Sequence, residues 1–329
     1  MKKLVVGATG IIGNHIVREL LKAGHEVIAA NRSLDVAPNL DGLDVERVAV
    51  DLNDYQSLLK ACKKADWVFM AAAYYPRDTF HKKKHIKISD SWTQNIIRAT
   101  KEANIQKLIY TSSLTTIGKA PQKLLANEEL GYDMVGRDPH PYFCVKHLAE
   151  QQLLKAYHQN DCPVVIVNPT GCFGPFELKP IHLCLIPQLL NKKLKLYVHS
   201  DINVVDTGDV ARGHILAAER GRLGERYILG GHNITTEMLI KEICEVGAVK
   251  PPKIVVPIQM GVPVAFMGEF VSMMLKKDPI LPLLGLRFAQ YGQHFSIDKA
   301  VDELGYEVSP MSQCYGQAIE WYKKLNYIN

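Results

Sequence analysis

Short, uninterrupted apolar runs recur through the first half of the chain. They lie at Leu4–Val6, Val27–Ala30, Val48–Val50, Trp67–Ala71, Leu108–Tyr110 and Val164–Val167. Runs without polar alternation are typical of strands that a parallel sheet buries on both faces. Segments of helical period separate these runs, as at Ile12, Ile16 and Leu20. This alternation predicts an α/β fold with a doubly wound parallel sheet of the Rossmann type.

The pattern changes after residue 170, where prolines cluster at positions 175, 180 and 187 and a mixed tail follows a helix-like segment at 209–220. We therefore predict a dinucleotide-binding domain over residues 1–168, rejoined by part of 202–228. Residues 169–201 and 229–329 are expected to form a smaller C-terminal lobe that binds the substrate.

Composition is that of an ordinary soluble protein, with 47% hydrophobic and 22% charged residues and a net charge of +5. The densest basic run, HKKKHIK at 81–87, reads as a solvated helix or loop face, so we expect no nucleic-acid partner. The seven cysteines are scattered and never spaced as CxxC. This favours neither disulfides nor a metal site, and a reducing cytoplasm is the simpler location.

An apolar stretch at 254–275 is interrupted by Pro257, Pro263 and Glu269. We interpret it as a buried or pocket-lining segment and expect no integral membrane insertion, while peripheral membrane contact stays open. The N-terminal apolar run does not read as a signal peptide, because glycines interrupt it before polar residues follow.

The first predicted strand runs directly into GATGIIG, which spaces Gly7, Gly10 and Gly13 as GxxGxxG. Glycines here allow a sharp turn, close approach of the backbone to a pyrophosphate and close packing of the next helix. The N–H groups at the start of that helix then face the phosphates. We predict a dinucleotide site that also includes the other residues of this loop, Thr9, Ile11 and Ile12.

The stretch YFCVK puts Tyr142 four positions before Lys146. In a helix the two side chains would lie on one face, a turn apart. A phenol, with its ordinary pKa of about 10, exchanges protons poorly at neutral pH, and a nearby ammonium would favour the phenolate. These five residues alone are equally compatible with a plain helix start.

In order and spacing, GATGIIG, YTSSLTTIG (110–118) and YFCVK resemble the extended short-chain dehydrogenase/reductase superfamily. Later stretches, VVIVNPTGCFGP (164–175) and FSIDKAVDELGYEV (295–308), resemble its branch of dihydroflavonol-4-reductase-like proteins and hopanoid-associated sugar epimerases. The resemblance covers nearly the whole chain. Its motifs are specific for the superfamily and much less so for the substrate.

The resemblance implies that Tyr142 donates or accepts the proton, and that Lys146 lowers the pKa of Tyr142 and holds the nicotinamide ribose. Ser113, with its neighbour Ser112 as the alternative, would hydrogen-bond the substrate oxygen. Hydride transfer to a carbonyl develops alkoxide charge, which needs such a donor and a nearby proton source.

The resemblance also implies cofactor contacts after the third, fourth and sixth predicted strands. They are Asp51 and Leu52 at the adenine, Ala71, Ala72 and Ala73 at the pyrophosphate and ribose, and Asn168, Pro169 and Thr170 beside the nicotinamide.

The second strand ends in Asn31, Arg32 and Ser33, where NAD-preferring relatives usually carry an acid for the ribose hydroxyls. A guanidinium can bind a 2′-phosphate through two hydrogen bonds. NADP is therefore the predicted cofactor, and NAD stays the alternative.

These features predict an NADPH-dependent oxidoreductase acting on a carbonyl or secondary alcohol of a small-to-medium organic substrate. A nucleotide-sugar epimerase is the alternative, and a non-catalytic cofactor-sensing protein a second one, although such proteins typically lose the Tyr or the Lys. We expect the substrate pocket near Tyr74–Arg77 and residues 172–190. By resemblance we also expect a homodimer through helices at about 86–103 and 142–158, with Ile86, Trp92, Ile96 and Ile97 as apolar surface.

Overall fold

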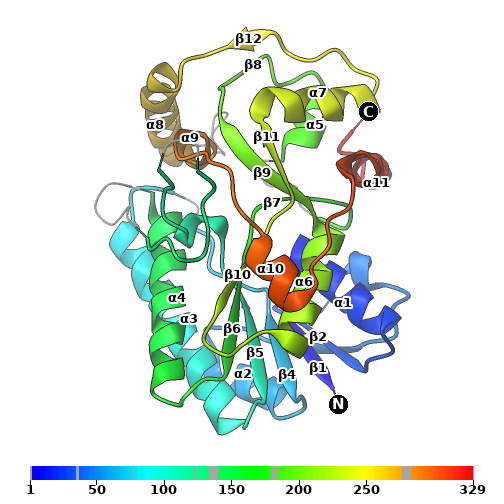
Figure 1. The fold of residues 1–329 in the computed structure, drawn as a ribbon, viewed down its shortest axis with the longest axis vertical. Coiled ribbons are helices and arrows are strands. Elements are labelled where there is room, and N and C mark those ends of the chain that lie inside the picture. Colours follow the sequence, from blue (N-terminus) through cyan, green and yellow to red (C-terminus); the bar gives the residue numbers. More distant parts are fainter. Residues whose placement is uncertain are drawn as a thin grey trace.

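The computed structural model describes residues 2–34, 37–76, 78–121, 124–132, 140–178, 184–275 and 283–328. Its main element is a seven-stranded sheet in the order β10-β6-β5-β4-β1-β2-β3, with every neighbouring pair parallel (Figure 1). The strands are β1 (Lys3–Val6), β2 (Val27–Asn31), β3 (Glu46–Ala49), β4 (Trp67–Met70), β5 (Lys107–Thr111), β6 (Val164–Pro169) and β10 (Arg226–Leu229). All six predicted strands are confirmed, and β10 is added at one edge.

Helices cover both faces of this sheet, because successive strand residues point to opposite sides. Val5 and Phe69 lie in a core formed with α1 (Ile11–Lys22), α6 (Thr207–Arg220) and α10 (Asp298–Leu304). Leu4 and Met70 lie in the opposite core, with α2 (Tyr55–Cys62), α3 (Lys82–Glu102) and α4 (Pro141–His158). The predicted doubly wound α/β fold is confirmed.

The remaining elements gather at the end of the molecule opposite the N-terminus (Figure 1). Two small sheets are formed by β7 (Gly171–Phe173), β9 (Asp201–Asp206) and β11 (His232–Thr235), and by β8 (Leu196–Tyr197) and β12 (Ile254–Val255). The helices are α5 (Leu185–Leu190), α7 (Thr236–Val246), α8 (Ile258–Leu275), α9 (Leu283–Gln290) and α11 (Met311–Lys324). Two short 3-10 turns, η1 (Pro38–Leu40) and η2 (Leu114–Thr116), follow β2 and β5 of the large sheet.

The interpretation of 254–275 as a buried or pocket-lining segment is wrong. Helix α8 leaves Met260 and Met267 65% and 69% exposed, and it does not line the cavity described below. The reason is geometric, since a helix that is apolar all round can bury only the face that meets a neighbour. Of the helices that the structure describes, none is both long and apolar enough to cross a membrane.

The apolar residues expected to form a dimer surface face inward for the most part. Ile96 is 3% exposed in the core, and Trp92 and Ile97 pack against the same core. Ile86 is half-buried. A homodimer stays a prediction.

Candidate active site

The glycine loop between β1 and α1 has no room for side chains at two of its three glycines. Gly7 has φ +89°, and a Cβ there would lie 2.7 Å from the backbone N of Ala72. A Cβ on Gly13 would lie 2.2 Å from the carbonyl O of Gly7. Gly10 caps α1 without a side-chain hydrogen bond. The first N–H groups of α1, which have no intrahelical partner, therefore stay open to a phosphate.

The end of β2 carries an unsatisfied polar atom. Asn31 is buried, its Nδ2 donates to the carbonyl O of Ser33, and its Oδ1 finds no partner in the part of the chain that the structure describes. Arg32 and Ser33 are exposed beside it. A buried acceptor here suits a ribose hydroxyl, and with the open helix start these residues fit a dinucleotide.

The other predicted cofactor residues divide into two groups. The N–H groups of Ala71 and Ala72 donate to the carbonyl O of Val6, at 3.0 and 2.8 Å, and bring the loop after β4 against the glycine loop. Ala73 follows in the same half-buried segment. By contrast, Asp51 accepts from the backbone N of Asn53 at 2.9 Å, and Leu52 is buried in the core.

Within the glycine loop, Thr9 makes a contact through its backbone. Its carbonyl O accepts from Nδ2 of Asn39 at 2.9 Å, which ties the loop to η1. Ile11 and Ile12 at the start of α1 line the cavity described below. The loop thus forms one end of the candidate site.

Two hydroxyls from distant parts of the chain meet at the centre of the site. Tyr142 lies in the first turn of α4, and its backbone N–H donates to Nδ1 of His140 at 3.1 Å. Its hydroxyl lies 3.5 Å from Oγ of Ser113, just after β5. Pro141 occupies the first helical position, where a missing N–H costs nothing. Pro139, expected to contribute to this helix entry, lies outside the described residues.

Lys146 is buried one turn below Tyr142 but does not bond to it. Its Nζ donates to the carbonyl oxygens of Thr111 and Ser112, at 3.0 and 3.2 Å. Burial lowers the pKa of Lys146 to about 8, while the nearby Glu150 carboxylate opposes this shift. Burial also raises the pKa of Tyr142, while the hydrogen bond with Ser113 acts to lower it. The direction is opposite to the lowering expected from the sequence, because desolvation is the larger effect.

A buried polar network beneath the site was missed at the sequence level. The Glu150 carboxylate accepts from Oγ of Ser112, from Oγ1 of Thr116 at 2.7 Å and from Nη1 of Arg226 at 3.1 Å. Ser112 therefore points away from Tyr142, and Ser113 is the serine that faces it. The only local sign was that Glu150 follows Lys146 by one helical turn.

The three residues predicted beside the nicotinamide, Asn168, Pro169 and Thr170, do not all face the cavity. Nδ2 of Asn168 donates into the same network, to Oε2 of Glu150 at 3.0 Å and to the carbonyl O of Ser113 at 3.1 Å. Pro169 and Thr170 instead line the cavity, and Oγ1 of Thr170 donates to Oδ1 of Asn203 at 2.7 Å. Asn168 thus supports the serine loop from below rather than facing the cavity.

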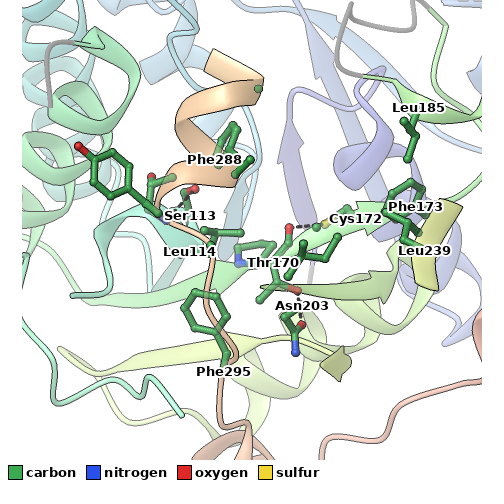
Figure 2. Close-up of a pocket in the computed structure, with 18 of the residues that line it drawn as sticks. Ser113, Leu114, Thr170, Cys172, Phe173, Leu185, Asn203, Leu239, Phe288 and Phe295 are labelled. Carbon is green, nitrogen blue, oxygen red and sulfur yellow. Dashed lines mark hydrogen bonds between the residues drawn. The ribbon is translucent and has the colours of Figure 1, made fainter. Parts of the chain in front are cut away.

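A cavity of about 520 Å³ extends from the glycine loop past the Ser113–Tyr142 pair to residues of β7, α5 and α7. Figure 2 shows Ser113, Leu114 and Phe288 on one side and Phe173, Leu185 and Leu239 at the opposite end. Most of its lining is apolar. Of the expected pocket region, Tyr75 and residues 172–174, 177 and 184–186 line it, whereas Arg77 and 179–183 lie outside the described residues.

Several lining residues had no sequence signal. They come from α7, α9, α11 and the segment after α9, and are Leu239, Gly285, Phe288, Ala289, Tyr291, Phe295 and Tyr322. Only the fold turns part of α9 toward the cavity.

Comparisons with known proteins agree with this geometry. A sequence profile of the NAD dependent epimerase/dehydratase family matches residues 3–230. A Synechocystis protein named for dihydroflavonol 4-reductase is 31% identical over 98% of this chain and 95% of its own length. Sterol demethylase protein B of Methylococcus capsulatus is 26% identical over the full length of both chains. The crystal structure of a nucleoside-diphosphate-sugar epimerase from Pseudomonas aeruginosa is 25% identical, covers 100% of this chain and 99% of its own, and superposes with a TM-score of 0.82.

Proposed function

Because the chain belongs to the NAD dependent epimerase/dehydratase family and is an NAD(P)-dependent oxidoreductase of that type, we propose that it reduces a carbonyl group or oxidises the corresponding secondary alcohol. The substrate is a small-to-medium, largely apolar molecule. The observation that carries the proposal is the pair of hydroxyls, Tyr142 and Ser113, 3.5 Å apart in a mostly apolar cavity that reaches the glycine loop.

In this proposal two side chains act on the substrate oxygen, and a third acts through one of them. A bound nicotinamide supplies or accepts the hydride. The Ser113 hydroxyl donates a hydrogen bond to the carbonyl oxygen, where negative charge develops. Tyr142 gives its phenolic proton to the same oxygen and recovers it from solvent. The ammonium of Lys146, fixed by two carbonyl oxygens, favours the phenolate that Tyr142 leaves behind.

We propose NADPH as the cofactor. Arg32 is exposed at the end of β2, next to the buried acceptor of Asn31, so its guanidinium is free to bind a 2′-phosphate. An acid in that position would repel the phosphate, and this chain has none there. NAD remains the alternative cofactor.

The apolar lining favours the reductase over the nucleotide-sugar epimerase. A sugar nucleotide carries a diphosphate, which calls for positive charge or many hydrogen-bond donors in the pocket. Lys119 is the one Lys or Arg among the described lining residues. A relative named for sterol demethylation is consistent with an apolar substrate.

The experiment is an assay of NADPH oxidation against a panel of aldehydes and ketones, with Tyr142→Phe as the test variant. Losing the phenolic proton should lower turnover about 10²–10⁴-fold and leave cofactor affinity nearly unchanged. Tyr197→Phe, in β8 and outside the cavity, is the matched control. A Tyr142→Phe variant with wild-type rates would reject the mechanism. Purified protein that retains tightly bound NAD would favour the epimerase instead.

We propose a reducing cytoplasm as the location, since all seven cysteines are free thiols.

We further propose a homodimer through the outer faces of α3 and α4. Leu148 on α4 is 39% exposed. Light scattering of the wild type, of Leu148→Glu and of the control Leu223→Glu tests the dimer. A monomer mass for the wild type at micromolar concentration would rule it out.

A further inference from the structure

Helix α8 presents an uncharged apolar stripe to solvent. Met260, Val264, Met267, Val271 and Met274 follow one another at alternating steps of four and three residues, which places them on one helix face. Their exposed fractions run from 51% to 69%. Exposed apolar patches of this kind mark interaction sites more often than single exposed residues do.

The opposite side of α8 is occupied. Ala265 and Val262 pack with Leu283 and Leu286 of α9. Glu269, the one charged residue in α8, is turned inward and accepts from the backbone N of Thr79 at 2.9 Å. The stripe is therefore left without a charge of its own, and the helix is apolar over most of its surface. Such helices are normally buried in protein or in lipid.

Positive charge lies at the start of α3, which contacts α8. The ring of Phe80 contacts the rings of Phe266 and Phe270, with centroids 5.5 and 5.8 Å apart, and holds the start of α3 against α8. Helix α3 begins two residues later. In its first two turns Lys83, Lys84 and Lys87 are exposed, and none has an ion pair within the described ranges.

We propose that the α8 stripe and these three lysines form a docking surface for an anionic lipid bilayer. The apolar side chains enter the boundary between headgroups and acyl chains, and the ammonium groups contact the lipid phosphates. A helix of 18 residues is about 27 Å long. It lies in the plane of the interface, because its other face is fixed on α9 and no described helix is suited to crossing.

The charge pattern favours lipid over a second copy of this chain. A two-fold contact between two α8 stripes would bring both lysine groups to the rim of one interface. Like charges there repel each other and weaken association. An anionic lipid surface attracts the same lysines, with about 1 kcal/mol for each lysine, or roughly fivefold in affinity.

Docking would also hold one wall of the cavity at the lipid surface. Helix α9 packs against α8 on one side and contributes Phe288 and Ala289 to the cavity on the other. This suits a substrate that dissolves in the membrane. Only that consequence rests on the proposed function, since vesicle binding requires no turnover.

The test is flotation of the purified full chain with phosphatidylcholine vesicles, with and without phosphatidylserine. The wild type should float with the anionic vesicles and much less with phosphatidylcholine alone. Changing all three lysines to glutamine should weaken binding about a hundredfold. Replacing Lys60, Lys155 and Lys250, which are also exposed, by glutamine is the matched control and should change vesicle binding little.

A second pair of variants tests the stripe. Met260→Glu combined with Met267→Glu should abolish flotation, whereas Met238→Glu, on α7 and 48% exposed, should not. The replaced side chains are mostly exposed, so unfolding temperature and NADPH binding should stay those of the wild type. Met274→Glu serves as a further variant if the double one unfolds.

Three outcomes would overturn the proposal. The first is a wild type that fails to float with anionic vesicles. The second is a control set that loses as much binding as the test set. The third is a stripe variant whose mass by light scattering falls to half while flotation is unchanged, which would identify α8 as a contact between copies.

Discussion

The hydroxyl of Tyr142 lies 3.5 Å from Oγ of Ser113, while the adjacent Ser112 points the other way and donates its hydroxyl to Glu150. The two serines are neighbours at the end of β5, where successive side chains alternate in direction. Sequence spacing alone left both open as the residue that binds the substrate oxygen. Their different partners distinguish them.

Ser113→Ala should therefore lower kcat about 10²–10³-fold, the usual effect of removing one donor from a developing oxyanion. Ser112→Ala should keep turnover within a few fold and instead lower the free energy of unfolding by about 1 kcal/mol, since it removes a buried hydrogen bond. Steady-state kinetics and urea unfolding on both variants separate the roles. Equal loss of turnover in the two would contradict the assignment.

The pKa of Lys146, lowered by burial to about 8, makes cofactor binding pH-dependent. Above that pH the side chain loses its proton and its attraction to the anionic cofactor. The dissociation constant of NADPH should thus rise with pH, by at most about tenfold per pH unit. Titrations between about pH 7 and about pH 10 measure this. In Lys146→Met, NADPH binding should be weaker and independent of pH. A wild type whose NADPH affinity does not change with pH would argue against a charged Lys146 in cofactor binding.

Arg32→Ala should weaken NADPH binding at least about tenfold and leave NADH binding nearly unchanged, because a charge-assisted hydrogen bond is worth about 1.5–3 kcal/mol. Adding Asn31→Asp should favour NADH further, although Nδ2 of Asn31 then no longer donates to Ser33. Dissociation constants for both cofactors decide this, with Arg98→Ala as an exposed control. An unchanged ratio would mean that Arg32 only faces solvent.

Gly13→Ala should lower the stability of the fold, whereas Gly10→Ala should mainly weaken cofactor binding. A Cβ on Gly13 would meet the carbonyl O of Gly7 at 2.2 Å, so the loop must shift and the unfolding free energy should fall by about 1–3 kcal/mol. At Gly10 the nearest described atom is 3.4 Å away, so the fold should tolerate alanine while cofactor binding weakens. Thermal unfolding and NADPH titration measure the two effects. Similar unfolding losses in both variants would be inconsistent with this view.

Glu150→Gln should destabilise the protein by about 3–5 kcal/mol, because it leaves Arg226 without its buried partner. A double variant, Glu150→Gln with Arg226→Met, should recover part of this loss, since no unpaired charge remains. Urea unfolding of both variants is the measurement. A double variant less stable than the single one would show that the Glu150–Arg226 ion pair itself stabilises the protein, and that the loss does not come from an unpaired Arg226.

Much of the fold was readable from local patterns. A strand buried on both faces has to be apolar throughout, which made six strands of the large sheet visible as continuous runs. The tight turn after β1 can be made only with glycine at positions 7 and 13, so the cofactor loop was also visible. The spacing of Tyr142 and Lys146 is a property of one helix and needed no other part of the chain.

What lay beyond local pattern was decided by packing between distant segments. Ser113 meets Tyr142, Glu150 meets Arg226, and Phe288 meets the cavity only because the sheet, α4 and α9 come together in one arrangement. An apolar helix likewise reads the same in the sequence whether a neighbour covers one face or all of it, and for α8 the structure alone showed which face stays open. The sequence by itself determined the elements, their order and the chemistry available. Tertiary structure decided which side chains meet, because contact depends on the position of whole elements and not on the period within any one of them.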